Sequence, residues 1–266
     1  MKKMTSKEHT FVICAYKDSQ YLEECIRSLV RQRDYSDILM VTSTPSDYIT
    51  ELANKYEIEL FVNEGESGIT QDWEYAISKS QTDIVTIAHQ DDIYEIDYSK
   101  RVIDAIRSSS NPIIAFTDYY EIIEGKKIYK NKLLRIKRLM LSLFRLPLAE
   151  KSIFIRRLVL SLGNPICCPS VAYYLPNISR PLFNHHFRSN EDWEAWEKLS
   201  KENGDFIYIN KMLMAHRIHN ESETSIIIGE DSRSLEDYEM YRKFWPKCIA
   251  RYLARKYKES EKYNNL

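Results

Sequence analysis

Short apolar runs alternate with amphipathic segments through the first half of the chain. The runs are bounded by polar or turn-forming residues, and they predict buried strands at residues 10–15, 38–41, 59–62, 84–88 and 112–117. Between them, apolar residues recur at the spacing of one helix face, which predicts helices at 19–32, 46–56, 70–80 and 98–109. Alternation of this kind is typical of a doubly wound α/β fold, with a mostly parallel sheet and helices on both faces.

Composition favours a soluble globular protein with one main domain. The chain of 266 residues can bury a substantial core, and its formal net charge of −1 gives no overall attraction to nucleic acid. No apolar run approaches the length of about 20 residues that crosses a bilayer, and the polar first residues lack the apolar core of a signal peptide. The five scattered cysteines show no zinc spacing. We therefore expect a cytoplasmic protein with free thiols.

Two adjacent carboxylates, Asp91 and Asp92, stand just beyond the predicted strand 84–88. The two negative charges repel each other and are costly to desolvate. A fold tolerates such a pair where a hard divalent cation with a phosphate ligand neutralises the charges. The carboxyl end of a strand in an open α/β sheet is also where ligands bind. The alternative is structural, because either aspartate could cap the next helix.

Motifs of several other enzyme classes are missing from the sequence. No G-x-G-x-x-G follows the first predicted strand and no G-x-x-x-x-G-K-[ST] occurs, which argues against dinucleotide oxidoreductases and P-loop enzymes. A G-x-S-x-G nucleophile elbow is also absent.

Short motifs follow one another in a fixed order along the chain. The first is a strand, an aromatic residue, an Asp and a helix that ends in Ser-Leu-x-x-Gln, at residues 11–18 and 21–32. Later motifs lie at Asn63-Glu-Gly65, residues 87–92, Asn190-Glu-Asp-Trp193 and residues 217–222. This ordered set resembles the family 2 glycosyltransferases, which have the GT-A fold. The resemblance covers roughly residues 10–225.

The resemblance implies an inverting enzyme that moves a sugar from a nucleotide sugar to a saccharide or lipid-linked saccharide. UDP is the expected nucleotide at the level of the family, and bacterial surface polysaccharide, such as lipopolysaccharide or capsule, is the expected product. Direct displacement needs a carboxylate that accepts the proton of the acceptor hydroxyl. Asp192 is assigned this role, with Glu191 as the alternate. Both residues would also be suitable at a helix N-terminus, which is the structural alternative.

A divalent metal ion, Mn²⁺ or Mg²⁺, is the cofactor that the resemblance implies. Asp91 matches the metal-binding aspartate of the family's DxD motif, and His219 and Asp92 complete the expected metal site. His89 stands where the family has the first aspartate of that motif. It would share a strand face with Asp91, and it could ligate metal, contact the ribose or simply pack at the end of the strand.

The expected donor site departs from the family after the second strand, where Ser43 replaces an acidic residue that contacts the base. Trp73 is a candidate for the donor pocket, although a tryptophan at its helical spacing is more often a core residue. The residues assigned to donor binding are Ala15, Tyr16, Asp18, Ser43, Asn63, Trp73, His89, Gln90 and Asp91.

The second half of the chain carries a basic, amphipathic segment. Residues 126–157 hold eleven Lys or Arg residues against one acid, Glu150, interleaved with an apolar face. A helix of this kind could lie on an anionic membrane, or it could pack on the sheet and expose a basic side. We divide the chain into a GT-A-like domain, 1–225, and a helical basic and aromatic extension, 226–266. The domain comprises a nucleotide-sugar half at about 1–120 and an acceptor half at about 121–225.

Two further function classes stay open. A nucleotidyltransferase on a similar sheet would normally show a glycine-rich phosphate loop after its first strand, and residues 15–19 lack glycine. A non-catalytic carbohydrate-binding relative is the other alternative, because His89 and Ser43 replace expected carboxylates.

Overall fold

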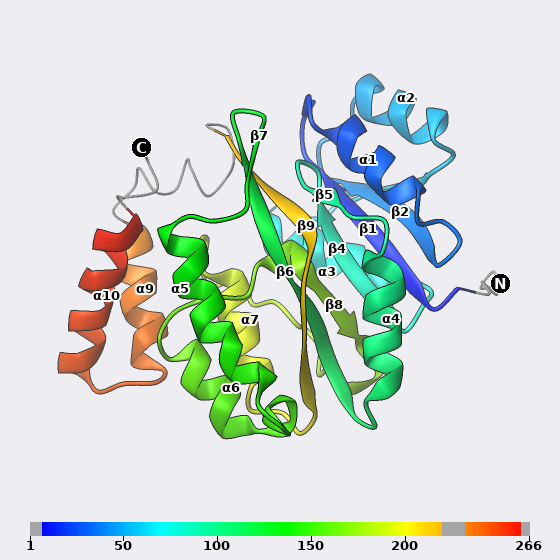
Figure 1. Ribbon diagram of the computed structural model, residues 1–266. Helices are drawn as coiled ribbons and strands as arrows, with labels where there is room; N and C mark the ends of the chain where they lie inside the picture. The colour runs from blue at the N-terminus through cyan, green and yellow to red at the C-terminus, as the bar shows by residue number, and fades with distance from the viewer. Residues whose placement is uncertain (1–6, 67, 220–231, 262–266) are drawn as a thin grey trace.

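The computed structural model describes residues 7–66, 68–219 and 232–261 (Figure 1). The five predicted strands are present as β1 (His9–Ala15), β2 (Ser36–Thr42), β3 (Glu59–Val62), β4 (Ile84–His89) and β6 (Pro112–Ile123). The four predicted helices are α1 (Leu22–Val30), α2 (Asp47–Lys55), α3 (Ile69–Lys79) and α4 (Tyr98–Ser108). The predicted α/β class is confirmed.

One sheet runs through the described residues, in the order β3-β2-β1-β4-β8-β6-β9-β5. It includes three strands that the apolar pattern does not predict, β5 (Ile93–Tyr94), β8 (Val171–Tyr174) and β9 (Asp205–Ile218), while β7 (Lys126–Ile128) pairs with β6. Strands β3, β2, β1 and β4 are parallel, and so are β6 and β9. Between these groups β8 is antiparallel to both of its neighbours. The sheet therefore joins the two predicted halves.

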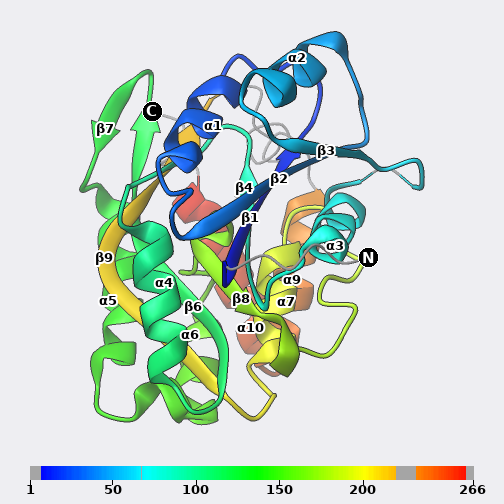
Figure 2. The ribbon, with the colours of Figure 1, turned by 90° about the vertical axis from the view of Figure 1, so that its right-hand side faces the viewer.

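Helices cover both faces of the sheet (Figures 1 and 2). On one face, apolar residues of α1, α2 and α4 form a core cluster with alternate residues of β1, such as Phe11 and Ile13. On the other face, Ala76 of α3 packs against Val12 and Val85. This alternation of strand side chains follows from the two-residue period of a strand. It explains why most residues of β1 and β4 are apolar on both faces of the sheet.

The basic segment 126–157 is not one helix. After β7 it forms α5 (Lys132–Leu141), two short 3₁₀ turns at Ser142–Arg145 and Ala149–Lys151, and the start of α6 (Ile153–Leu160). Asn131 caps α5 by accepting from the backbone N–H of Leu134 at 2.8 Å. Ser152 caps α6 in the same way, with the N–H of Ile155 at 3.2 Å. These two caps divide the segment into separate helices.

The second core cluster joins α7 (Glu191–Leu199) to the C-terminal pair α9 (Ser232–Arg242) and α10 (Lys247–Glu261). Trp193 of α7 is fully buried, and its ring meets Tyr241 of α9 edge to face at 5.1 Å. Ala250 and Ala254 of α10 are buried in the same cluster. Residues 226–231 and 262–266 of the predicted extension lie outside the described ranges. Within those ranges, no helix combines the length and apolarity needed to span a bilayer.

Candidate functional site

A cleft of about 520 Å³ lies at the carboxyl ends of β1 and β4. Its first wall is built by the end of β1 and by the start of α3, with Tyr16 and Trp73 among the lining residues. The opposite wall comprises residues 164–169, the segment 188–192 that leads into α7, and side chains from α5, α9 and α10. The cleft thus occupies the position where open α/β sheets bind ligands.

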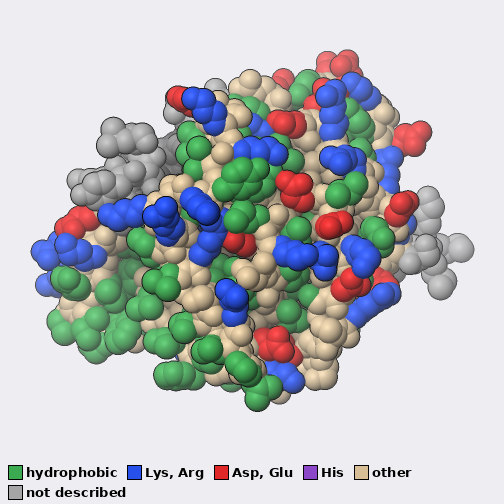
Figure 3. Space-filling model, in the orientation of Figure 1, with side chains coloured by type: hydrophobic (Ala, Val, Ile, Leu, Met, Phe, Trp, Pro, Cys, Tyr) green, Lys and Arg blue, Asp and Glu red, His purple; other side chains and the backbone are tan. Residues whose placement is uncertain are grey.

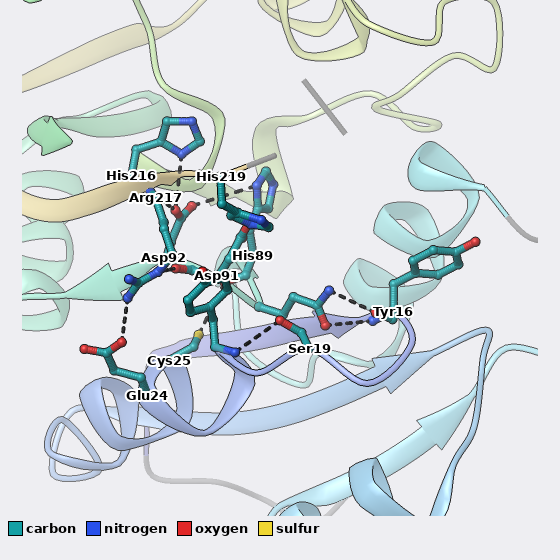
Figure 4. Close-up of polar contacts among 12 residues, drawn as sticks. Tyr16, Ser19, Glu24, Cys25, His89, Asp91, Asp92, His216, Arg217 and His219 are labelled. Atoms are coloured by element: carbon teal, nitrogen blue, oxygen red, sulfur yellow. Dashed lines mark hydrogen bonds and ion pairs between the residues drawn. The ribbon is translucent and has the colours of Figure 1, made fainter. Parts of the chain in front are cut away.

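Gln90 joins the ends of the two central strands. Its amide donates to the carbonyl oxygen of Tyr16 at 3.0 Å, and its oxygen accepts from the N–H of Tyr16 at 3.0 Å (Figure 4). Both of its functional groups are therefore used in positioning the strand ends. The phenol ring of Tyr16 is exposed. Ala15, Tyr16 and Gln90, which were all predicted to bind the donor, line the cleft.

Asp91 and His219 form a close pair on the cleft wall, although they are 128 residues apart in sequence. The Asp91 Oδ2 atom lies 2.9 Å from His219 Nε2 (Figure 4). Burial would raise the pKa of Asp91, but the His219 hydrogen bond and the nearby His89 and His216 hold that pKa below its ordinary value. Asp91 is therefore anionic at neutral pH.

Asp92 points away from the cleft into the protein. It is 0% exposed, and its Oδ1 accepts from the backbone N–H of Arg217 at 2.9 Å and meets His216 Nδ1 at 3.2 Å. This carboxylate therefore holds the end of β9, and it is not among the residues that line the cleft. The predicted role of Asp92 in binding metal stays a prediction. Burial would lower the pKa of His216, but Asp92 raises it above the ordinary value.

His89 and Trp73 stack on each other at the floor of the cleft. Their ring centroids are 5.4 Å apart with an interplanar angle of 16°, and Phe183 meets the other side of Trp73 edge to face. His89 Nδ1 lies 3.9 Å from Asp92 Oδ2. The buried His89 Nε2 has no hydrogen-bond partner in the described part of the chain. Trp73 is thus both a core residue and a lining residue.

Arg217 fixes the loop that carries the acidic pair. Its Nε donates to the carbonyl oxygen of Asp91 at 2.9 Å, and its Nη2 reaches Glu24 of α1 at 2.5 Å (Figure 4). The guanidinium also lies 4.4 Å from the ring centroid of Tyr21, and that ring contacts His219 at 4.8 Å. In the motif at 217–219, His219 therefore lies in the cleft wall, and Arg217 positions the loop of Asp91. Residues 220–222 of this motif lie outside the described ranges.

Ser43 and Asn63 are both held by Asp72, a buried residue of α3. Ser43 Oγ donates to Asp72 Oδ2 at 2.7 Å, and Asn63 Nδ2 donates to Asp72 Oδ1 at 2.8 Å. Neither Ser43 nor Asn63 lines the cleft, whereas Asp72 does. Asp18 does not line the cleft either. Its carboxylate accepts a hydrogen bond from Ser46 Oγ, at the start of α2, at 2.6 Å.

Asp192 stands on the opposite wall, in the first turn of α7. Its Oδ2 accepts from Asn164 Nδ2 at 2.8 Å, and its Oδ1 accepts from the N–H of Trp193 at 2.6 Å. Burial raises the pKa of Asp192 above its ordinary value, although these hydrogen bonds oppose the shift. Glu191, the alternate base, is more deeply buried and also lines the cleft.

The loop before Asp192 is anchored by the C-terminal helix α9. Glu236 accepts from the backbone N–H groups of Arg188 and Ser189 at 2.9 Å each. Asn190 donates to the buried Asp237 at 2.9 Å. Two carboxylates of α9 thus hold the segment that leads into Asp192, one through its backbone and one through the side chain of Asn190. Helix α9 is therefore part of the site.

Asp91 and His219 fit a divalent ion. Octahedral Mg²⁺ holds ligands at about 2.0–2.1 Å, which places neighbouring ligand atoms about 3 Å apart, and the paired atoms here are 2.9 Å apart. The described residues contain no group of three or more His, Cys, Asp and Glu arranged as a metal site. The protein therefore offers one carboxylate and one imidazole, and the other positions suit phosphate oxygens and water.

Several lining residues escape sequence reasoning, namely Asp72, Lys137, Arg188, Arg233 and Tyr257. Asp72 could have been flagged as an acidic residue beside Trp73 on the helix after the glycine turn. The others come from segments whose place in the fold depends on tertiary packing.

Comparisons with known proteins give a family and a fold. The family model described as "Glycosyl transferase family 2" matches residues 10–183. Comparison with curated proteins gives no significant match. The chain belongs to glycosyl transferase family 2, and it is a glycosyltransferase of the nucleotide-sugar-dependent class.

Three solved structures illustrate the shared GT-A fold. S. aureus TarS 1–349 in complex with UDP-GlcNAc has a TM-score of 0.65 at 14% identity, over 93% of this chain and 70% of that chain. Glucosyl-3-phosphoglycerate synthase from Mycobacterium tuberculosis, in complex with Mn²⁺, UDP and phosphoglyceric acid, has a TM-score of 0.59 at 12% identity, over 91% and 80%. The mannosyltransferase PcManGT from Pyrobaculum calidifontis, in complex with GDP-Man and Mn²⁺, has a TM-score of 0.61 at 12% identity, over 95% and 73%.

Proposed function

We propose that this enzyme transfers a sugar, with inversion, from a UDP-sugar to a hydroxyl of a saccharide or lipid-linked saccharide. The observation that carries the proposal is that one cleft is lined both by the paired Asp91 and His219 and by Asp192 at the start of α7. Structural neighbours bound to UDP-GlcNAc and to Mn²⁺ with UDP support the same donor chemistry. Synthesis of bacterial surface polysaccharide, either lipopolysaccharide or capsule, is the role we assign to the reaction.

The donor end of the cleft is the wall formed by β1 and α3. Tyr16 offers an exposed aromatic ring for a nucleobase, and Asp72 offers a carboxylate that can accept from base or ribose. Because Asp72 already accepts from Ser43, the carboxylate lies beside the position where the family has an acid after its second strand. The contribution of Ser43 and Asn63 would then be to orient Asp72.

The leaving group of this reaction is a nucleoside diphosphate, which gains negative charge as the sugar departs. Asp91 and His219 would hold a divalent ion, Mn²⁺ or Mg²⁺, which when bound stabilises this charge as a Lewis acid. For His219 to ligate through Nε2, that nitrogen must give up the proton that it shares with Asp91. Arg217 keeps the loop of Asp91 in place through the carbonyl oxygen of that residue.

Asp192 would act as the base that accepts the proton of the acceptor hydroxyl. Asn164 and the N–H of Trp193 each hold one of its oxygens, so the orientation of the carboxylate is fixed before the substrate arrives. Each carboxylate oxygen can accept a second hydrogen bond. In a single displacement the acceptor hydroxyl attacks from the side opposite the leaving group, so the base that takes its proton has to stand on that side.

Calorimetric titration with UDP, GDP and CDP, each with and without Mn²⁺, tests the function. We expect UDP to bind most tightly, and Mn²⁺ to strengthen its binding by at least about tenfold, because an ion held by Asp91 and His219 would offset the negative charge of the diphosphate. Binding of none of the three nucleotides under either condition would rule out the proposal and favour a carbohydrate-binding relative without catalysis. A nucleotidyltransferase would instead release pyrophosphate from a nucleoside triphosphate, which a coupled phosphate assay detects.

We also propose that the enzyme works on the cytoplasmic side of a membrane, with peripheral contact to anionic lipid. Exposed apolar side chains gather on α5, on α6 and on the turns between them, and Leu139, Leu148 and Phe154 are 73%, 72% and 73% exposed. Figure 3 shows hydrophobic side chains over the part of this face where α5, α6 and α10 lie, with Lys and Arg beside them. Exposed cations of the same segment include Arg135 and Lys151. Apolar contact flanked by cations is the composition of interfacial binding.

Vesicle flotation tests this contact. We expect the protein to float with phosphatidylcholine vesicles that contain phosphatidylglycerol, and to float less as salt is raised. Leu139→Glu together with Phe154→Glu should abolish flotation, because two charges would then enter the headgroup region. Ile96→Glu, at an exposed apolar residue of another surface, should not change it. A stable dimer in sedimentation, lost in the double variant, would assign the same face to a second copy of the chain.

A further inference from the structure

One cation in the cleft forms no ion pair with a carboxylate in the described part of the chain, although its charge acts on Asp192 at longer range. Lys137 of α5 lines the cleft, and its Nζ donates to the hydroxyl oxygen of Tyr119 at 3.0 Å. The ammonium also lies 5.5 Å from the centroid of the same ring. In the described part of the chain no carboxylate lies within 4.0 Å of this ammonium, although Arg138, the next residue, is paired with Asp118 at 2.7 Å. Lys137 therefore holds a partly buried charge whose hydrogen bond goes to a neutral phenol, and among the described residues no carboxylate forms an ion pair with it.

The position of Lys137 assigns it to the acceptor side of the cleft. Burial raises the pKa of Asp192 and of Cys167, and the charge of Lys137 opposes both shifts, so Lys137 lies near the wall that carries these two residues. Two further cations, Arg188 and Arg233, line that same wall. By contrast, the lining residues of the donor wall, from β1 and the start of α3, include no Lys or Arg.

A half-buried ammonium in a cleft is costly unless an anion or several hydrogen bonds compensate its lost hydration. Tyr119 supplies one hydrogen bond, and a lysine ammonium has three donors. The remaining donors point to a ligand with negative charge. Phosphate and carboxylate groups both meet this requirement, since each forms short charge-assisted bonds with a lysine.

We propose that Lys137 is the centre of a binding subsite for an anionic group of the acceptor, a phosphate or a carboxylate near the hydroxyl that receives the sugar. The inference rests on the proposed function and adds the chemical class of the acceptor. Lys137 binds the anionic group, Asp192 takes the proton of the neighbouring hydroxyl, and the hydroxyl oxygen forms the new glycosidic bond as the nucleoside diphosphate leaves. Tyr119, held in the core, keeps the ammonium in position. Burial raises the pKa of Tyr119, so its hydroxyl stays neutral.

Calorimetry on the full chain saturated with UDP and Mn²⁺ tests this subsite, with glycerol 3-phosphate, glycerate and glycerol as probes. We expect the wild type to bind at least one of the two anionic probes at least about tenfold more tightly than glycerol, because a charge-assisted contact is worth that much or more. Lys137→Met should remove this preference, while Lys137→Arg should keep most of it. Lys130→Met, which removes a charge from the exposed loop before α5, is the matched control and should keep the preference.

The affinity for UDP with Mn²⁺ distinguishes the possible failures. If Lys137→Met weakens UDP binding as much as it weakens binding of the preferred probe, the lysine belongs to the donor diphosphate and the inference is overturned. It is also overturned if the wild type binds all three probes alike, or if Lys137→Met keeps the preference while transfer is lost, since the lysine would then act on Asp192 alone. Absence of UDP binding in the wild type would contradict the proposed function itself. A thermal melt of each variant verifies that it is folded.

Discussion

Replacing Asp192 with asparagine is expected to reduce sugar transfer by about two to four orders of magnitude, which is the usual contribution of a positioned general base. The amide has nearly the same shape and can still accept from the N–H of Trp193, so the start of α7 should keep its structure. Asparagine cannot accept the proton of the acceptor hydroxyl at any relevant pH. Because Asp192 lies on the wall opposite the donor, the affinity for UDP with Mn²⁺ should stay within about twofold of the wild type.

Glu191→Gln is the matched control for this prediction, since it makes the same change one residue earlier on the same wall. Glu191 is 6% exposed, and burial of this degree leaves it less able to meet a substrate. Full turnover by Asp192→Asn, with loss of transfer in Glu191→Gln, would assign the base to Glu191. Unchanged turnover in both variants would exclude a carboxylate base at this position.

The pH dependence follows from the direction of the pKa shift. Burial raises the pKa of Asp192 above the ordinary value of aspartate, which is about 3.9. A base works only when deprotonated, so the transfer rate should be full above this raised pKa and fall as pH decreases through it. The acidic limb of the pH–rate profile should therefore lie above the range of an ordinary aspartate, and Asp192→Asn should lack that limb.

The first half of the fold could be predicted because its central strands, β1 and β4, are buried on both faces. Such a strand is mostly apolar when helices cover both sides of a parallel sheet, and a short apolar run between polar segments is easily recognised. Strand β9 is harder, because Asn210 and Lys211 are exposed in its middle. Its register with β6 also shifts near Asp118. Polar residues at such an irregularity interrupt the pattern on which sequence reasoning depends.

The candidate site also has some residues that the sequence could predict and others that it could not. The resemblance selected Asp91, His219 and Asp192, and the fold brings all three to one cleft; their roles remain predictions. Ser43 and Asn63 were selected by position along the chain, but sequence position does not reveal that Asp72 of α3 would accept hydrogen bonds from both. Lys137 could not be distinguished from the other cations of its segment. Only the packing of α5 shows which lysine enters the cleft.

Replacing Asp91 with alanine is expected to abolish the gain in UDP affinity that Mn²⁺ provides, and to reduce transfer by about a hundredfold or more. An ion that stabilises the leaving diphosphate contributes several kcal/mol to the transition state, and each 1.36 kcal/mol is about tenfold in rate. Asp91 pairs with His219, the other residue that would hold the ion, at 2.9 Å. Calorimetry with UDP, with and without Mn²⁺, measures the first effect, and a transfer assay measures the second. Asp104→Ala, at an exposed aspartate of α4, should change neither.

Asp92→Asn distinguishes the role of Asp92 from that of Asp91, which the sequence alone cannot do. Because Asp92 accepts from the backbone of Arg217 and lies fully buried, its loss of charge should reduce stability, by about 1–3 kcal/mol for a disturbed buried hydrogen bond. The folded fraction should still bind UDP more tightly with Mn²⁺. If instead Asp92→Asn stays as stable as the wild type and loses the Mn²⁺ effect, the metal ligand is Asp92, and the pair formed by Asp91 and His219 is a structural contact. The two variants together therefore determine which member of the acidic pair faces the substrate.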